Sequence, residues 1–176
     1  VKLLMVGRKS ADALRREYGK QFIDSFEGIQ GTSVSFSDAA SLSDTIRTGF
    51  EAGDYDVCTM IYNKFVNAIT QEITLTQLIP AEMNVDDNGD AGVHYEYEPE
   101  EGELLSSLLP RILSTQLYSA LLESSAAELA ARMTAMDNAT RNAGDLIDRL
   151  TLVYNRTRQA AITSELIQII SGAEAV

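Results

Sequence analysis

The segment RILSTQLYSALLESSAAELAARMTAMDNATRNAGDLIDRL, residues 111–150, decides the fold of this chain. Leu, Ala, Glu, Arg and Met dominate it, and these residue types favour helices. Between Pro110 and Gly172 the only residue that strongly disfavours a helix is Gly144. We therefore predict one very long helix over residues 101–176.

The apolar residues of this helix follow the spacing of a coiled-coil seam. Alternate steps of four and three residues from Leu104 to Ile167 reach mostly apolar or small side chains. About 60 residues of helix extend about 90 Å, farther than a small α/β layer can cover, so we expect the seam to need a partner that this chain does not supply. Some seam positions are charged or polar, which indicates a partner other than a simple leucine zipper: Arg111, Arg132, Thr157 and Ser164.

Residues 1–100 carry the alternating strand and helix signals of a small Rossmann-like α/β domain. The apolar run Val1–Val6 predicts a strand, and Ser10 can cap a helix whose apolar residues keep helical spacing as far as Phe26, before Gly28. The elements expected next are an edge strand at Val34–Phe36, a helix capped by Ser41 or Ser43 and ended by Gly53, a strand at Tyr55–Tyr62, and a strand at Ile73–Ile79 that pairs with it as a hairpin.

An acidic hairpin is predicted over residues 84–98, because turn-forming residues dominate its first part, NVDDNGDAG. The opening spacing suits a calcium loop, but Tyr95 stands where such a loop needs a bidentate Glu. His94 lies in the same hairpin, with no second His or Cys to share a metal. We therefore expect no metal site.

Composition excludes several classes of protein. The chain has 176 residues, enough for one sizeable domain, and a net charge of −12, which makes nucleic-acid binding a poor hypothesis. The single cysteine, Cys58, is interpreted as a small apolar side chain in a buried strand. No apolar run approaches the roughly 20 residues that span a bilayer, so we expect contact with a membrane only through partners.

Candidate catalytic residues are weak. The turn GRKS, Gly7–Ser10, follows the first strand, but the spacing of a phosphate-binding loop or of a dinucleotide fingerprint is missing. The carboxylates of EPEEGE lack the apolar surroundings that tune an acid and a base. We expect no catalytic residues and no cofactor.

The C-terminal sequence resembles a known family. Residues 130–175, AARMTAMDNATRNAGDLIDRLTLVYNRTRQAAITSELIQIISGAEA, are similar to the C-terminal helix of the gamma subunit of F-type ATP synthase. The family signature reads Ile or Val, Thr, any residue, Glu, two of any, an acid, three of any, then Gly-Ala. Here it runs ITSELIQIISGA, from Ile162 to Ala173, with Gln168 in place of the acid. VKLLMVGRK, YNKFVN and YEYEPE extend the resemblance to the α/β region.

The resemblance implies a rotating central stalk. In this family an N-terminal helix forms an antiparallel coiled coil with the C-terminal one, so the chain is expected to be the C-terminal portion of such a subunit, without that partner helix. The implied partners are the alpha and beta subunits of the catalytic head, an epsilon-type subunit and the c-ring. The implied location is peripheral, on the cytoplasmic face of a bacterial inner membrane or the matrix face of the mitochondrial one.

The resemblance also implies site residues. Arg158 and Gln159 match a pair that contacts a beta-subunit loop, Thr163 and Glu165 match two further residues at that contact, and Arg132 matches an arginine near the acidic lever of beta. An apolar tip is expected to lie in a sleeve at the top of the ring: Ile167, Ile169 and Ile170.

Two other hypotheses remain open from the residues alone. The strand and helix alternation also suits a stand-alone α/β nucleotide-binding module with a helical dimerisation arm. The seam also suits a coiled-coil scaffold that forms homodimers.

Overall fold

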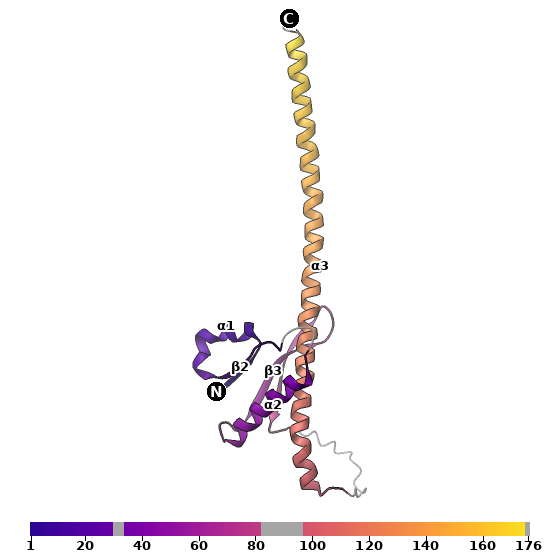
Figure 1. Cartoon of the computed structure of the whole chain (residues 1–176). Helices are drawn as coiled ribbons and strands as arrows, with labels where there is room; N and C mark the ends of the chain where they lie inside the picture. Colours follow the sequence, from indigo (N-terminus) through magenta and orange to yellow (C-terminus); the bar gives the residue numbers. More distant parts are fainter. Residues whose placement is uncertain (30–33, 82–96, 175–176) are drawn as a thin grey trace. The chain divides into compact units, whose positions relative to one another are not determined.

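The computed structural model describes residues 1–29, 34–81 and 97–174. Two strands flank the first helix and a 3-10 turn: β1 (Leu3–Val6), α1 (Arg8–Tyr18), η1 (Gly19–Gln21) and β2 (Phe22–Phe26). The elements that follow are α2 (Phe36–Glu51), β3 (Cys58–Phe65), β4 (Gln71–Ile79) and the long helix α3 (Glu101–Glu174) (Figure 1). The predicted fold class, a small strand-and-helix domain followed by one very long helix, is confirmed.

The described strands form two separate two-stranded sheets. β1 and β2 are parallel, with α1 as the crossover between them, and β3 and β4 are antiparallel. Gly7 turns the chain from β1 into α1 with a φ of 101°, a conformation that favours glycine. The predicted first strand is thus present as β1, and the predicted hairpin is present as β3 and β4.

The end of the first predicted helix is wrong. α1 begins at Arg8 instead of after Ser10, and it ends at Tyr18. Phe22–Phe26, predicted to continue the helix, is strand β2, which pairs in parallel with β1. Three apolar residues within five positions fit a helix and a strand equally well, and pairing with β1 decides between them.

The start of α2 also differs from the prediction. Phe36 is its first residue, so the predicted edge strand at Val34–Phe36 is absent from these described residues. Ser35 is the cap instead of Ser41 or Ser43: its Oγ accepts the Ser37 N–H at 3.3 Å, and Asp38 Oδ2 accepts the Ser35 N–H at 3.1 Å. These bonds satisfy backbone donors that the first turn would leave unpaired.

The third predicted strand starts three residues late, at Cys58 instead of Tyr55. The Tyr55 hydroxyl donates a hydrogen bond to the Ile46 carbonyl, which ties the loop to α2. Burial, and after it the nearby Cys58 and Asp54 charges, raise the pKa of the Tyr55 hydroxyl. Partial burial also raises the pKa of the Cys58 thiol. The predicted buried strand is wrong, because Cys58 is only half-buried and no residue of β3 is buried.

Most of the predicted acidic hairpin, including His94, lies outside the described residues. Of residues 84–98 the structure describes only Tyr97 and Glu98. The hairpin and the calcium-loop alternative therefore stay sequence predictions.

One core lies between α2, β4 and the first part of α3. Its buried residues are Ala39 (0% exposed), Leu42 (1%), Ile46 (7%), Leu78 (4%) and Leu117 (6%). Partly buried side chains of the strands, such as Leu4, Val6 and Met60, pack against this cluster. The rings of Phe36 and Tyr118 meet edge to face with their centroids 5.6 Å apart.

The chain divides into two compact units, Val1–Ala130 and Ala131–Val176. The first, unit 1, holds every described strand, α1, α2 and the beginning of α3. The second, unit 2, is helix throughout its described residues, 131–174.

Replacing Leu42 by Ala tests the core. We expect Leu42→Ala to lower the free energy of unfolding by about 2–5 kcal/mol, because it leaves a cavity among buried side chains. The control is Leu75→Ala, since Leu75 is 66% exposed on β4, and its expected change is below about 0.5 kcal/mol. Urea unfolding measures both, and equal losses would contradict this core.

Candidate functional site

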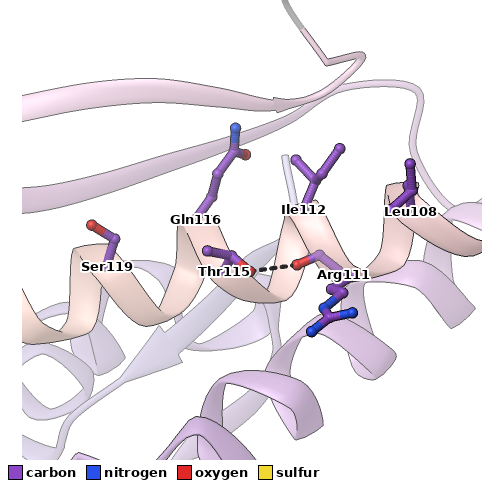
Figure 2. Close-up of a pocket in the computed structure, with 6 residues that line it drawn as sticks. All are labelled: Leu108, Arg111, Ile112, Thr115, Gln116 and Ser119. Carbon is purple, nitrogen blue, oxygen red and sulfur yellow. Dashed lines mark hydrogen bonds between the residues drawn. The ribbon is translucent and has the colours of Figure 1, made fainter.

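Within unit 1, α3 has a buried side and an exposed side. Leu117, Ala120 and Ala127 are buried, at 6%, 5% and 2% exposed. The opposite side carries a shallow groove of about 400 Å³ (Figure 2). Its lining residues all belong to α3: Leu108, Arg111, Ile112, Thr115, Gln116 and Ser119.

The groove lies along the predicted seam, because Leu108, Arg111 and Thr115 are seam residues. The Thr115 hydroxyl donates to the Arg111 carbonyl at 2.7 Å, so its polar hydrogen is satisfied within the helix (Figure 2). Leu108 and Ile112 stay 39% and 44% exposed. At the groove the seam of unit 1 therefore leaves an apolar face unpacked, whereas the next seam residue, Tyr118, packs against the core.

In unit 2 almost every side chain is exposed. Of residues 131–173, all but Thr134 and Asn155 are exposed. The large apolar side chains range from 50% exposed at Ile162 to 72% at Leu152, and they are Met133, Met136, Leu146, Ile147, Leu150, Leu152, Val153, Tyr154, Ile162, Leu166, Ile167, Ile169 and Ile170. A helix with apolar residues on all sides is normally covered by other segments.

The predicted polar site residues all lie exposed on α3. Arg158, Gln159, Thr163 and Glu165 fall within about two turns of helix, so the structure brings these four together. Arg132 does not join them, because 26 residues of helix separate it from Arg158 by about 39 Å. The site is thus one cluster of four residues, which we call the polar cluster, and one remote arginine.

The polar cluster lies outside the seam, on two flanks of α3. At about 100° per residue, its members lie roughly 90–130° around the helix from the mean direction of the nearby seam residues. Those seam residues are Thr157, Ala160 and Ser164. A partner helix could therefore occupy the seam while the polar cluster contacts something else.

Arg158 keeps its charge unpaired among the described residues. Two arginines elsewhere in the chain are paired with an acid four residues away: Arg141 with Asp137 at 2.9 Å, and Arg47 with Glu51 at 3.0 Å. Neighbours of Arg158 at these helical spacings are Tyr154, Asn155, Ala161 and Ile162, none of them acidic. Its guanidinium carbon lies 5.9 Å from the centroid of the Tyr154 ring.

The side chains of the polar cluster differ in whether they can donate or accept hydrogen bonds to a partner. The Thr163 hydroxyl donates to the Gln159 carbonyl at 2.8 Å, so towards a partner it can only accept. Glu165 also accepts only, whereas the planar fork of Arg158 only donates and suits a carboxylate. Arg158 and Glu165 share one flank of the helix, and Gln159 and Thr163 share another, roughly 100–160° away. A partner would therefore hold an acid opposite Arg158 and a donor opposite Glu165 on the first flank, and a donor opposite Thr163 on the second.

The predicted apolar tip lies in the last turns of α3. Ile167, Ile169 and Ile170 are 58%, 68% and 58% exposed. Their directions spread around the helix, and Ile162 and Leu166 add to them. Gln168, the departure from the family signature, is exposed among them.

One residue beside the polar cluster was missed by the sequence analysis. Tyr154 is 64% exposed and lies outside the seam, yet it holds the closest ring to Arg158. An aromatic residue four positions before an arginine on a helix is the signal that could have identified it.

Gly144 lies inside α3, and a Cβ added there would meet no atom within 4 Å. Over the described parts of the chain, no helix has both the length and the hydropathy needed to cross a membrane.

A small strand-and-helix domain that continues into a long helix with uncovered apolar faces defines a subunit built to insert into a larger assembly. The family model described as ATP synthase matches residues 1–176. ATP synthase gamma chains are 52% identical in Parvibaculum lavamentivorans and 53% in Gluconacetobacter diazotrophicus, in each case over 100% of this chain and 61% of the relative. The chain belongs to the ATP synthase gamma-chain family.

Solved structures agree with this assignment. A chain of the mitochondrial ATP synthase of Tetrahymena thermophila, in a structure of its central stalk and c-ring, is 30% identical with a TM-score of 0.62, over 78% of this chain and 60% of that one. A chain of the Euglena gracilis mitochondrial enzyme matches in fold, with a TM-score of 0.70 at 22% identity over 99% of this chain and 61% of that one. This chain spans about three fifths of the length of these relatives.

The lack of packing in unit 2 predicts its behaviour in the isolated chain. A helix without tertiary contacts is only marginally stable in water. We expect backbone amides of residues 135–170 to exchange hydrogen at least tenfold faster than those of residues 113–121, which pack on the core. Exchange followed by mass spectrometry measures this, and equal protection in the two segments would contradict it.

Proposed function

We propose that this chain is the C-terminal part of the gamma subunit of an F-type ATP synthase, the rotor of its central stalk. In that role it couples proton-driven rotation to ATP synthesis, and hydrolysis to reverse rotation, at the beta subunits. The carrying observation is the match of the entire chain to gamma chains above 50% identity. The uncovered faces of α3 support it, because a rotor helix needs partners on more than one side.

The seam has an occupant in this proposal. An N-terminal helix, supplied by the part of the relatives' length that this chain does not span, packs along the seam as the other half of an antiparallel coiled coil. The groove between Leu108 and Ser119 supports this placement, because it is an unpacked face on the side of α3 away from the core.

The two parts of the chain then have different neighbours. We assign residues 1–100, with the acidic hairpin 84–98, to the end of the stalk near the epsilon-type subunit and the c-ring, and residues 101–176 to the coiled coil inside the ring of alpha and beta subunits. The complex would be peripheral, on the cytoplasmic face of a bacterial inner membrane or the mitochondrial matrix face. This chain would meet the membrane only through partners.

The polar cluster is the proposed contact with a beta subunit. Arg158 has no ion pair among the described residues, and Gln159, Thr163 and Glu165 add complementary groups on the two flanks of the helix that the seam leaves free. Arg132, about 39 Å away along the helix, would make a separate contact with beta. The apolar tip, Ile167, Ile169 and Ile170, would lie in an apolar sleeve at the top of the ring, which would remove its exposed surface from water.

No catalytic residue is proposed in this chain, and the nucleotide chemistry belongs to the beta subunits. The alternative function, a stand-alone nucleotide-binding module, predicts tight binding of ATP or NAD at one site. Isothermal titration with either nucleotide distinguishes the two, because a rotor subunit would give no such isotherm.

Replacing Arg158 tests the rotor function. We expect Arg158→Ala, in the full-length gamma subunit assembled with alpha and beta subunits and the membrane sector, to slow proton-driven ATP synthesis about tenfold or more, since hydrogen bonds to charged groups contribute about 1.5–3 kcal/mol each. The thermal unfolding of the isolated chain should stay unchanged, because the side chain has no ion pair among the described residues.

Arg156→Ala is the matched control. It removes the same charge two residues away, on a face roughly 160° around the helix, and its expected synthesis rate is close to that of the wild type. Equal losses from both variants would show a general charge effect. A fall in thermal stability on Arg158→Ala would show that this arginine is structural.

A further inference from the structure

We infer that Tyr154 is a positioning residue that holds the Arg158 guanidinium in the orientation used for its partner contact. The inference rests on the proposed function, because it specifies how one residue of the polar cluster is prepared for the beta subunit. Tyr154 lies on α3 about one turn before Arg158, the first residue of the polar cluster.

The contact follows from helix geometry. Side chains on a helix lean towards its N-terminus, so a residue reaches back over the one four positions earlier. Arg158 reaches back over Tyr154, and its guanidinium carbon lies 5.9 Å from the ring centroid. At this distance the negative face of the ring attracts the cation.

A packing role does not explain Tyr154 within this chain. The residue is 64% exposed and lies outside both the seam and the buried core. Among the described residues, the charged group recorded over its ring is the Arg158 guanidinium.

An acid in place of this tyrosine would serve a different purpose. Asp137 holds Arg141 in the same four-residue spacing, but it also neutralises the charge. An aromatic ring restrains the guanidinium without consuming its N–H donors, which stay available for a carboxylate of the partner. Arg156 provides a contrast, because Leu152 occupies the corresponding position before it.

The size of the effect follows from the loss of side-chain freedom. Arginine loses much rotamer freedom when it binds, and a prior contact with the ring reduces that loss. An exposed cation–π contact corresponds to about a two- to fivefold change in an equilibrium constant. We expect removal of the ring to lower ATP synthesis by this factor, a smaller effect than that of Arg158→Ala.

The test is a double-mutant cycle in the full-length gamma subunit within the assembled ATP synthase. The variants are Tyr154→Leu, Tyr154→Phe, Arg158→Ala, and Arg158→Ala combined with Tyr154→Leu. Rates of proton-driven ATP synthesis are compared at equal amounts of assembled complex. Leu favours helices at least as well as Tyr, so helix propensity would not explain a loss.

We expect Tyr154→Leu to slow synthesis about two- to fivefold, Tyr154→Phe to keep the wild-type rate, and Tyr154→Leu to have no further effect once Arg158 is Ala. Such non-additivity is the mark of a residue that acts through another. Conservation of the rate by Phe separates the ring from the hydroxyl.

Four results would overturn the inference. Wild-type synthesis by Tyr154→Leu would show that the ring does not matter, and the same loss in both backgrounds would show that Tyr154 acts independently of Arg158. A Tyr154→Phe variant as slow as Tyr154→Leu would show that the hydroxyl makes the contact. A wild-type rate for Arg158→Ala would contradict the proposed contact itself, and the inference with it, whereas a slow Arg158→Ala beside a normal Tyr154→Leu overturns the inference alone.

Discussion

The structure depends on one constraint: α3 is much longer than the domain it packs against. Burial of apolar surface stabilises the first part of the helix, where Leu117 joins the core formed by α2 and β4. Beyond Ala130 the same helix continues, and over residues 131–173 every side chain except those of Thr134 and Asn155 is exposed. Because a helix of this kind gains most of its stability from packing, its conformation in unit 2 has to be completed by other segments.

The sides of α3 differ in composition. The seam carries small and apolar residues at a coiled-coil spacing, while the polar cluster lies on two flanks outside it. At most seam positions a charged group would meet an apolar neighbour, whereas off the seam it can meet a partner of complementary charge. The polar seam positions are Arg111, Arg132, Thr157 and Ser164. In the proposed rotor, the N-terminal helix would cover the seam and a beta subunit would contact the polar cluster, within the same few turns of α3.

The sequence predicted the long elements better than the short ones. α3 and the β3–β4 hairpin were predicted because each repeats one period over many residues. β2 was missed because Phe22, Ile23 and Phe26 suit both periods, and the deciding factor is a strand distant in sequence. The cap of α2 was missed although Ser35 and Asp38 have the capping-box spacing, because the alternation around Val34 suggested a strand.

The candidate site came from the resemblance rather than from physical patterns. Exposed arginines are common on helices, and periodicity does not distinguish Arg158 from Arg156. The structure adds that Arg158, unlike Arg156, has an aromatic ring one turn before it, and that the Thr163 hydroxyl is already engaged with its own helix. The contact of Tyr154 with Arg158 could have been inferred from their four-residue spacing, and the structure places the guanidinium carbon 5.9 Å from the ring centroid.

Gly144 lowers the local stability of α3. Glycine makes a helix less stable than alanine by about 1 kcal/mol at such a position, and the open space around it shows that no described neighbour requires its small size. Between Ala131 and Ser171, Gly144 is therefore the position of lowest intrinsic helix propensity in α3. In the isolated chain, the helical hydrogen bonds around this residue are expected to open before those on either side of it.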